Sequence, residues 1–475
     1  MKPLWAEAPA PSKKQAPART SAFLAVAAGL MALGTTVCVP ALPAGAASVA
    51  PSLSHIGGAL TVWSEWTSVE QQYFEAAYAP FTAETGVTIN YKGESSNIAA
   101  TVQAAVTGGK GPDVAFVPSP ATLDALAAKH DLQPVAPVIG SEVKNYGAAW
   151  NQLASYNGTQ YGVWFKAANK NTIWYNPAEF ATAGIKTPPK TWQQLLADAA
   201  TLHAAGVVPF SFCSDIGWPV ADLWQNVYLK TAGAVNYNKL AAHQISWQDP
   251  TVTTAFNTLA ELVGKPQYLL GGTSGALSES AKYPSCVDQV FPKPGAMPKA
   301  AMVIEADFVV GEITGNSSNY QAGTSYPGGK KCTANPAQTP CYDFFPFPAP
   351  AANQKNNTAL QGAGDVAMLI RATPQAKAFM RYIASPEPAE IWAHIGGFAS
   401  PNMKVPLSSY PDPVTRADAS ELAHATSFVF SLDDLQSWEP SMWQDMLNFV
   451  KNPTKSNIAS IQATMEKQAT TAHQS

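Results

Sequence analysis

Short apolar runs alternate with amphipathic segments over the first part of the chain after residue 58. The runs have the length of buried strands, and the segments between them carry apolar residues at helical spacing. The expected strands are 60–63, 87–91 and 114–117, and the expected helices are 68–84, 98–107 and 120–129. Strand and helix in regular alternation are typical of a mostly parallel sheet covered by helices.

The same alternation begins again further along the chain. Thr191 and Gln194 have the spacing of a capping box, which marks a helix start after two prolines. The expected strands are 172–175, 207–212, 301–304 and 366–370, and the expected helices are 191–205, 252–263, 373–384 and about 440–470. We therefore expect two α/β units with a cleft between them, the place where small ligands bind.

The composition is rich enough in hydrophobic residues for large cores, and its charge argues against nucleic acid as a partner. The 475 residues have room for two or three domains or one two-lobed unit, and 46% of them are hydrophobic, with 13 Trp. Only 13% are charged, and the formal net charge is −4. A mildly acidic chain without a basic patch is not expected to bind nucleic acid.

The N-terminus has the order of a secretory signal peptide. Lys13, Lys14 and Arg19 precede an apolar run at 21–39, and small residues follow at 44–48. We predict that residues 1–46 are a cleaved signal and that the protein is exported, to a periplasm or cell surface. Two alternatives stay open, an N-terminal membrane anchor and a lipid anchor at Cys38.

Four cysteines remain after the signal: Cys213, Cys286, Cys332 and Cys341. An even number in an exported chain predicts two disulfides, for which three connectivities exist. We favour Cys213–Cys286 and Cys332–Cys341, and buried free thiols are the alternative. Because no C-x-x-C occurs, we expect neither zinc nor thioredoxin chemistry.

Motifs of catalysis are missing from the sequence. The seven histidines form no H-E-x-x-H, and neither G-x-S-x-G nor a P-loop occurs. Residues 362–367 match a dinucleotide pattern but lead into a strand instead of a helix. Glu305/Asp307 and Asp433/Asp434 could pair as in a glycosidase, yet acids close in sequence are common. We expect no catalytic residue, cofactor or metal.

Aromatic and polar residues occur together at strand ends and in loops. Sugars present flat C–H faces that aromatic rings cover, and hydroxyls that carboxylates, amides and lysines bind. The mixed clusters lie at 63–66, 164–166, 217–224 and 438–443. This pattern predicts carbohydrate binding.

Eight stretches, in this order, resemble the extracellular solute-binding proteins of ABC sugar importers, in the branch similar to α-glucoside-binding proteins. They are 61–64, 81–87, 111–114, 164–176, 189–192, 217–219, 362–365 and 396–402. The resemblance implies a periplasmic-binding-protein-like fold of maltose-binding type, with two α/β lobes, each a mostly parallel sheet flanked by helices. The implied N-terminal lobe is 56–165 and 342–385, and the C-terminal lobe is 166–341 and 386–475.

The resemblance also implies a function without catalysis: a monomer traps an oligosaccharide between the lobes and delivers it to the membrane subunits of an ABC permease. The expected ligand is an α-glucoside or another small oligosaccharide. The alternatives are an exported glycosidase, a binding protein for a non-sugar solute and a sensor ectodomain. Few arginines follow the signal, which disfavours a phosphorylated ligand.

Matched positions supply the expected ligand-binding residues. They are Trp63, Glu65, Trp66, Ser95, Ser96, Pro118, Ser119, Lys166, Lys170, Trp218, Asp222, Glu305, Asp307, Asp365 and Trp443. The stretch 221–226 departs from the family pattern, because it lacks one Trp and two acids and has Trp224 instead. The identity of the sugar therefore stays open.

Overall fold

The structure is a computed structural model, and it describes residues 55–474 apart from 96, 215, 318, 324–339 and 425–426. The chain divides into two units, Met1–Pro51 and Ser52–Ser475. All described residues belong to the second unit. The predicted signal peptide and Cys38 lie outside the described residues.

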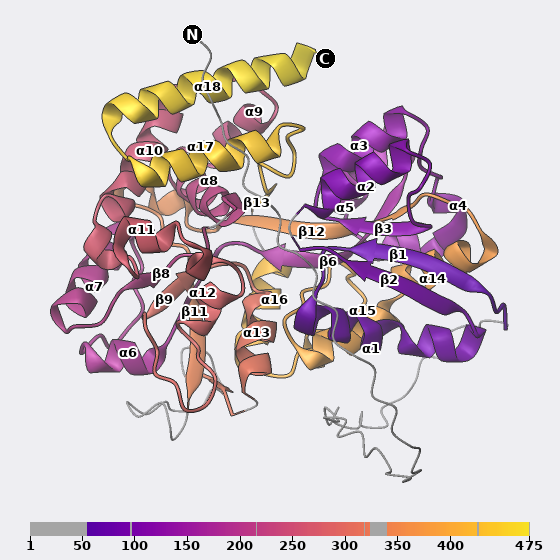
Figure 1. The fold of residues 1–475 in the computed structure, drawn as a ribbon, viewed down its shortest axis with the longest axis horizontal. Helices are drawn as coiled ribbons and strands as arrows, with labels where there is room; N and C mark the ends of the chain where they lie inside the picture. The colour runs from indigo at the N-terminus through magenta and orange to yellow at the C-terminus, as the bar shows by residue number, and fades with distance from the viewer. Residues whose placement is uncertain are drawn as a thin grey trace, which may run out of the picture. The chain divides into compact units, whose positions relative to one another are not determined.

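The first sheet has the order β13-β12-β3-β1-β2, and β6 also pairs with β12 (Figure 1). Its strands are β1 (Ala59–Ser64), β2 (Thr88–Gly93), β3 (Val114–Val117), β6 (Gly162–Asn169), β12 (Ala359–Leu369) and β13 (Ser427–Phe430). β1 is parallel to β2 and β3, whereas β12 is antiparallel to β3 and β6. The sheet is therefore mixed, with long β12 at its centre.

Helices cover both faces of this sheet. The helices are α1 (Ser68–Thr85), α14 (Pro374–Ala384) and α15 (Pro386–Ile395) on one face, and α2 (Ile98–Thr107) and α3 (Pro120–Ala128) on the other. Leu60 and Val62 of β1 point into the first core, whereas Trp63 packs against the second. This is the alternation of side chains that a strand covered on both faces requires.

The second sheet has the order β10-β11-β7-β9-β8. Its strands are β7 (Thr172–Tyr175), β8 (Phe210–Ser211), β9 (Met302–Ile304), β10 (Gln321–Ala322) and β11 (Cys341–Pro346). β7 is antiparallel to both of its neighbours, whereas β10 is parallel to β11 and β8 to β9, so this sheet is also mixed. A separate two-stranded ribbon consists of β4 (Ser155–Tyr156) and β5 (Thr159–Gln160).

A large hydrophobic core joins the second sheet to several shorter segments and to five long helices, among which α17 and α18 lie side by side (Figure 1). These helices are α7 (Trp192–Ala204), α8 (Trp218–Ala232), α10 (Pro250–Val263), α17 (Glu439–Lys451) and α18 (Lys455–Gln474). A smaller core on the other face uses α12 (Ser285–Asp288) and α13 (Val309–Asn316). The remaining α-helices are α4 (Ala136–Ile139), α5 (Ala148–Leu153), α6 (Pro177–Thr182), α9 (Ala234–Ala241), α11 (Gly272–Ala276) and α16 (Pro413–His424).

Local sequence signals set several helix ends as expected. The Thr191 side chain accepts a hydrogen bond from the Gln194 amide (3.2 Å), so it caps the first turn of α7. Gly86 ends α1 in the left-handed conformation, with φ 69°. The predicted helix over 98–107 and the predicted strand over 114–117 have the same bounds as α2 and β3.

One predicted disulfide is present. Cys213 and Cys286 are bonded, with their Cα atoms 5.2 Å apart. Cys341 is also disulfide-bonded, and Cys332, its predicted partner, lies outside the described residues. The pairing of Cys332 with Cys341 stays a prediction.

Strand pairing differs from the expected lobe boundaries in two places. β11, expected in the N-terminal lobe from residue 342 on, pairs with β7 of the second sheet. β13, expected in the C-terminal lobe, pairs with β12 of the first sheet. Strand pairing thus places β11 in the second sheet and β13 in the first, and the division into lobes stays a prediction.

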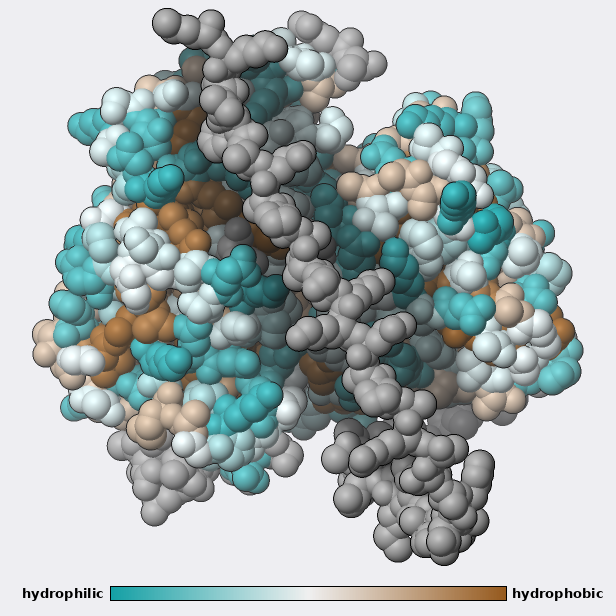
Figure 2. Space-filling view, in the orientation of Figure 1, coloured by the Kyte–Doolittle hydropathy of each residue, from teal (hydrophilic) through white to brown (hydrophobic). Residues whose placement is uncertain are grey.

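The surface in Figure 2 shows mainly hydrophilic and weakly hydropathic residues, with hydrophobic residues in separate patches. Among the described residues, no helix is both long and apolar enough to span a membrane.

Candidate functional site

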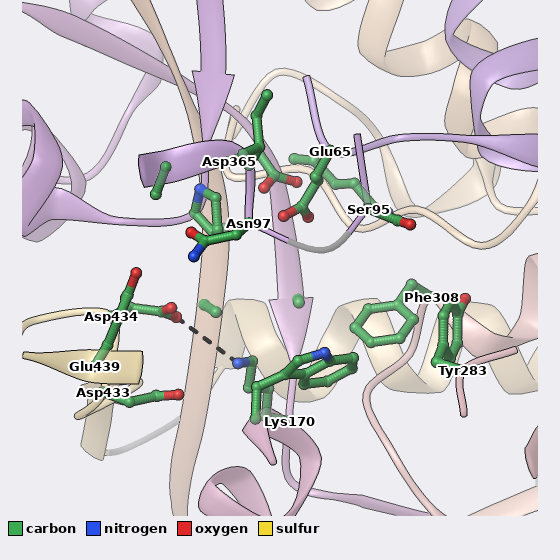
Figure 3. Close-up of a pocket in the computed structure, with 18 of the residues that line it drawn as sticks. Glu65, Ser95, Asn97, Lys170, Tyr283, Phe308, Asp365, Asp433, Asp434 and Glu439 are labelled. Atoms are coloured by element: carbon green, nitrogen blue, oxygen red, sulfur yellow. Dashed lines mark ion pairs between the residues drawn. The ribbon is translucent and has the colours of Figure 1, made fainter. Parts of the chain in front are cut away.

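A cavity of about 140 Å³ lies where the carboxyl ends of first-sheet strands face segments that pack on the second sheet (Figure 3). Residues from β6, β12, α1, α2 and the loops after β1, β2 and β3 form one side, and residues from α8, α17 and four loops form the other. The lining residues are Glu65, Glu70, Ser95, Asn97, Ile98, Ala99, Pro118, Lys166, Ala168, Lys170, Trp218, Tyr283, Phe308, Ala363, Gly364, Asp365, Asp433, Asp434, Glu439 and Trp443.

Lys166 anchors the first-sheet side of the cavity. It lies opposite Asp365 in the β6–β12 pairing, and its ammonium group bonds the Glu70 carboxylate on α1. Burial alone would lower the pKa of Lys166, but Glu70 above all raises it above its ordinary value. Lys166 is therefore a fixed positive charge in the wall.

Glu65 and Asp365 form a carboxyl–carboxylate pair beside Lys166. Burial, and then the charge of Asp365, raises the pKa of Glu65 well above its ordinary value. Burial also raises the pKa of Asp365, although Lys166 opposes the shift. The hydrogen bond between the two groups raises the pKa of Glu65 and lowers that of Asp365, so Glu65 is the protonated partner and donates. Asp365 also accepts from the Trp66 indole N–H at 3.2 Å.

Lys170 anchors the opposite side. Its Nζ lies 2.8 Å from an oxygen of Asp222, 3.1 Å from Ser431 Oγ and 3.7 Å from Asp434 Oδ2. Burial opposes the charge of Lys170, but the carboxylates, Asp222 above all, raise its pKa above the ordinary value. Burial raises the pKa of Asp222 to about 6 against the opposing effect of Lys170. Lys170 thus fixes the positions of Asp222 and Asp434 relative to each other.

Further acids lie beside this network, on the segment that leads into α17. Asp433 accepts a hydrogen bond from the Trp443 indole N–H at 2.8 Å, which fixes that ring. Burial raises the pKa of Asp434 well above its ordinary value and that of Glu439 to about 8. Oδ2 of Asp434 has no hydrogen-bond partner among the described residues.

Four half-buried aromatic side chains complete the wall. The rings of Trp218, Tyr283 and Phe308 lie 5.4 to 6.2 Å apart in edge-to-face contacts. Gly217 precedes Trp218 with φ 98°, and a Cβ there would lie 2.5 Å from the Trp443 carbonyl oxygen. Only glycine allows this close approach, which brings the starts of α8 and α17 together. The cavity thus combines ring faces with hydrogen-bonding groups.

The structure brings eight of the predicted site residues together around the cavity. They are Glu65, Ser95, Pro118, Lys166, Lys170, Trp218, Asp365 and Trp443. Asp222 stands directly behind them as the ion-pair partner of Lys170. Ser96 lies outside the described residues. That these residues bind a ligand stays a prediction.

Other predicted residues lie elsewhere. Trp66 is fully buried in the first core, because its ring packs against Phe74, Phe116 and Trp392 and not against the cavity. Trp63 packs outside the cavity, with the Lys92 ammonium 4.3 Å from its ring centre.

Ser119, Glu305 and Asp307 also lie outside the lining. The Ser119 hydroxyl caps α3 by accepting from the Thr122 amide and donates to the Asp434 carbonyl, both at 3.2 Å. Glu305 and Asp307 follow β9 and are buried, 5% and 4% exposed. Their carboxyl groups lie behind the cavity wall.

Sequence reasoning missed several lining residues. Glu70 is in the first turn of α1, Asn97 is the N-cap of α2, and Tyr283 and Phe308 stand in loops without a motif. Asp433 and Asp434 were noted as a pair of acids but not placed in the site. The only signal for them was their position next to the aromatic cluster 438–443.

The arrangement offers ring faces, hydrogen-bond acceptors and two ammonium groups. Within the described part of the chain, no group of three His, Cys, Asp or Glu is arranged to hold a metal ion. Such a combination of groups is suited to a polar molecule with flat apolar faces.

Comparison with known proteins defines the class. The family model described as "Bacterial extracellular solute-binding protein" matches residues 63–390, more than half of the chain. The chain belongs to this family of extracellular solute-binding proteins.

Two curated relatives extend over most of the chain. One is "Osmoprotective compounds-binding protein GgtB" of Synechocystis, 28% identical over 82% of this chain and 88% of that protein. The other is "Alpha-glucosides-binding periplasmic protein AglE" of Rhizobium meliloti, 27% identical over 85% of this chain and 86% of that protein.

Solved structures confirm the predicted two-lobed solute-receptor fold. The bacterial solute receptor AcbH, whose structure is described with a preference for β-D-galactopyranose, superposes with a TM-score of 0.72 at 20% identity. A chitin oligosaccharide binding protein superposes with a TM-score of 0.70 at 18% identity. Each comparison covers 87% of this chain and 99% of the other. At this identity the likeness concerns the fold.

Proposed function

We propose that the chain is the substrate-binding component of an ABC importer and that it binds a small oligosaccharide, with α-glucosides as the first class to test. The observation that carries the proposal is the cavity, where Trp218 and Trp443 offer ring faces beside the hydrogen-bonding groups of Asp365 and Lys170. Supporting names come from relatives that bind α-glucosides and osmoprotective compounds.

In this proposal the protein is exported and works as a monomer. The sugar contacts both sides of the cavity, so its binding free energy favours a closed arrangement of the lobes, which the membrane permease then recognises. The family name supports an extracellular site of action. The expected affinity is about micromolar, on the order of −8 kcal/mol.

The first experiment is a thermal-shift screen of residues 48–475 against monosaccharides, α- and β-linked oligosaccharides, polyols, amino acids and phosphorylated compounds. A ligand that binds only the folded state raises the melting temperature. A shift with a few disaccharides that are recovered intact supports the proposal. Hydrolysis of the sugar would indicate the glycosidase alternative, and a shift with charged non-sugar solutes alone would overturn sugar binding.

Trp443→Ala is the matched test of the site. The substitution removes a ring from the cavity wall, and we expect sugar affinity to fall about tenfold or more, or about 1.4 kcal/mol. Trp63→Ala is the control, because Trp63 is also half-buried but lies outside the cavity. Isothermal titration of both variants measures the difference, and equal losses would contradict the placement of the site.

A further inference from the structure

The cavity has a marked excess of acidic groups. Its described lining contains six carboxyl groups, those of Glu65, Glu70, Asp365, Asp433, Asp434 and Glu439, against two ammonium groups, those of Lys166 and Lys170. A neutral sugar accepts or donates hydrogen bonds but brings no charge to offset this excess.

Both lysines are already engaged within the protein. Lys166 bonds Glu70, and Lys170 bonds Asp222, which stands behind the lining. The Lys170 ammonium also lies 3.7 Å from Asp434 Oδ2, so the two ammonium groups are shared among the acids and the carboxyl groups stay in excess.

Three of those acids already have donors. Asp365 accepts from the Trp66 indole, and Glu65 shares its proton with Asp365. Asp433 accepts from the indole of Trp443 and from the amide of Gln225, both at 2.8 Å.

Asp434 differs from these acids. It is 6% exposed and lines the cavity, and its Oδ2 has no hydrogen-bond partner within the described part of the chain. Figure 3 shows its carboxyl group beside those of Asp433 and Glu439, with Lys170 the one cation drawn near it, 3.7 Å away. A buried carboxylate oxygen without a donor is costly unless a ligand supplies one.

The aromatic residues provide a second, independent indication. Trp218, Tyr283 and Phe308 form a group of rings on the same cavity, and the Lys170 ammonium already lies 6.0 Å from the centre of the Trp218 ring. Ring faces attract cations as well as the C–H faces of sugars.

We propose that the preferred ligand is a saccharide that carries a protonated amine, and that Asp434 binds its ammonium group. This inference rests on the proposed function, because it names the chemical class within sugar binding. The rings cover the sugar faces, the acids of the wall accept its hydroxyl protons, and the ammonium group occupies the place next to Asp434.

Matched ligand pairs test the proposal by isothermal titration with the mature protein. Each pair differs in one hydroxyl exchanged for an ammonium group: glucose with glucosamine, galactose with galactosamine, and trehalose with an amino-trehalose. We expect the amine of at least one pair to bind about tenfold more tightly. Its N-acetyl derivative, which has no charge, should lose that advantage.

Asp434→Asn removes the charge while keeping the shape. We expect the ratio of amine to neutral-sugar affinity to fall about tenfold in this variant and to stay unchanged in Asp198→Asn, a control on α7 outside the cavity. Binding of neutral sugars with no amine preference in any pair overturns the inference and leaves the proposed function standing. No binding of any saccharide, charged or neutral, overturns both.

Discussion

At the residue scale, the site is organised around two buried lysines instead of a motif. Lys166 lies three residues before the end of β6 and Lys170 one residue after it, and each bonds carboxylates from distant segments. Lys170 joins Asp222 of α8 to the segment that contains Asp434, across more than 200 residues of sequence. Such a lysine orders a site whether or not it touches the ligand.

Lys170→Met tests this role. The change leaves Asp222 and Asp434 as buried acids without their cation, so we expect the free energy of unfolding to fall by about 3–5 kcal/mol. Lys92→Met is the control, since the Lys92 side chain is 48% exposed and its partner Glu94 lies at 3.9 Å. Urea unfolding measures both variants. A loss of under about 1 kcal/mol for Lys170→Met would contradict the network.

At the element scale, β12 links the pairing of the first sheet to the wall of the cavity. It pairs with β3, β6 and β13 and carries Ala363, Gly364 and Asp365 into the wall. A Cβ on Gly364 would lie 2.5 Å from the carbonyl oxygen of Lys166, so the strands pack more closely there than a side chain allows. Glycine at this position is a requirement of strand pairing.

Gly364→Ala should therefore lower the stability of the protein. The added methyl group forces β6 and β12 apart, and we expect a loss of about 1–3 kcal/mol in unfolding free energy together with weaker ligand binding. Gly147→Ala is the matched control, because a Cβ there would meet only the Trp150 ring at 3.7 Å. Chemical denaturation measures the unfolding free energy of both variants. Similar values would show that β6 and β12 adjust to the added methyl group without cost.

Elements also show where sequence reasoning worked. The sequence predicted β1 and β3 because each is a short apolar run of the usual strand length. It predicted α2 because its apolar residues recur at helical spacing. α8 was not predicted, because its first residues were interpreted as a loop. Every residue from Pro219 to Lys230 is buried, and polar side chains such as Asp222 and Gln225 bond within the protein.

β12 was predicted only from Val366 on. Its first half contains two glycines and a buried Gln361, which look like a loop, whereas hydrogen bonding to β6 and β13 makes them a strand. The site was predictable where strand ends carried Trp or charged residues. Tyr283, Phe308 and Glu70 could not be predicted, because only the fold brings them to the cavity.

At the scale of the whole molecule, buried acids set the response to pH. Burial raises the pKa of Glu439 to about 8 and those of Glu312 and Glu421 to about 7. The folded state therefore holds protons that the unfolded chain releases near its ordinary pKa of about 4.3. Their stabilising effect is complete below that value and is lost as pH rises through the folded pKa values.

We expect the protein to be more stable at pH 5.5 than at pH 8. Each proton held only by the folded state changes the unfolding free energy by about 1.4 kcal/mol per pH unit. Glu439→Gln should make the dependence shallower, whereas Glu279→Gln at an exposed position should not. Urea unfolding across this range measures the slopes, and a stability that rises toward pH 8 would refute the expectation.

The close approach of Gly217 to Trp443 has a consequence for the order in which the molecule is made. The lining begins at Glu65 and ends at Trp443, and the first sheet lacks β13 until residue 430 has been synthesised. A ribosome that has reached residue 400 has thus made both sheets except β13, but not the complete lining of the cavity. The cavity lining is completed only when the segment from Asp433 to Trp443 has been made, shortly before α18.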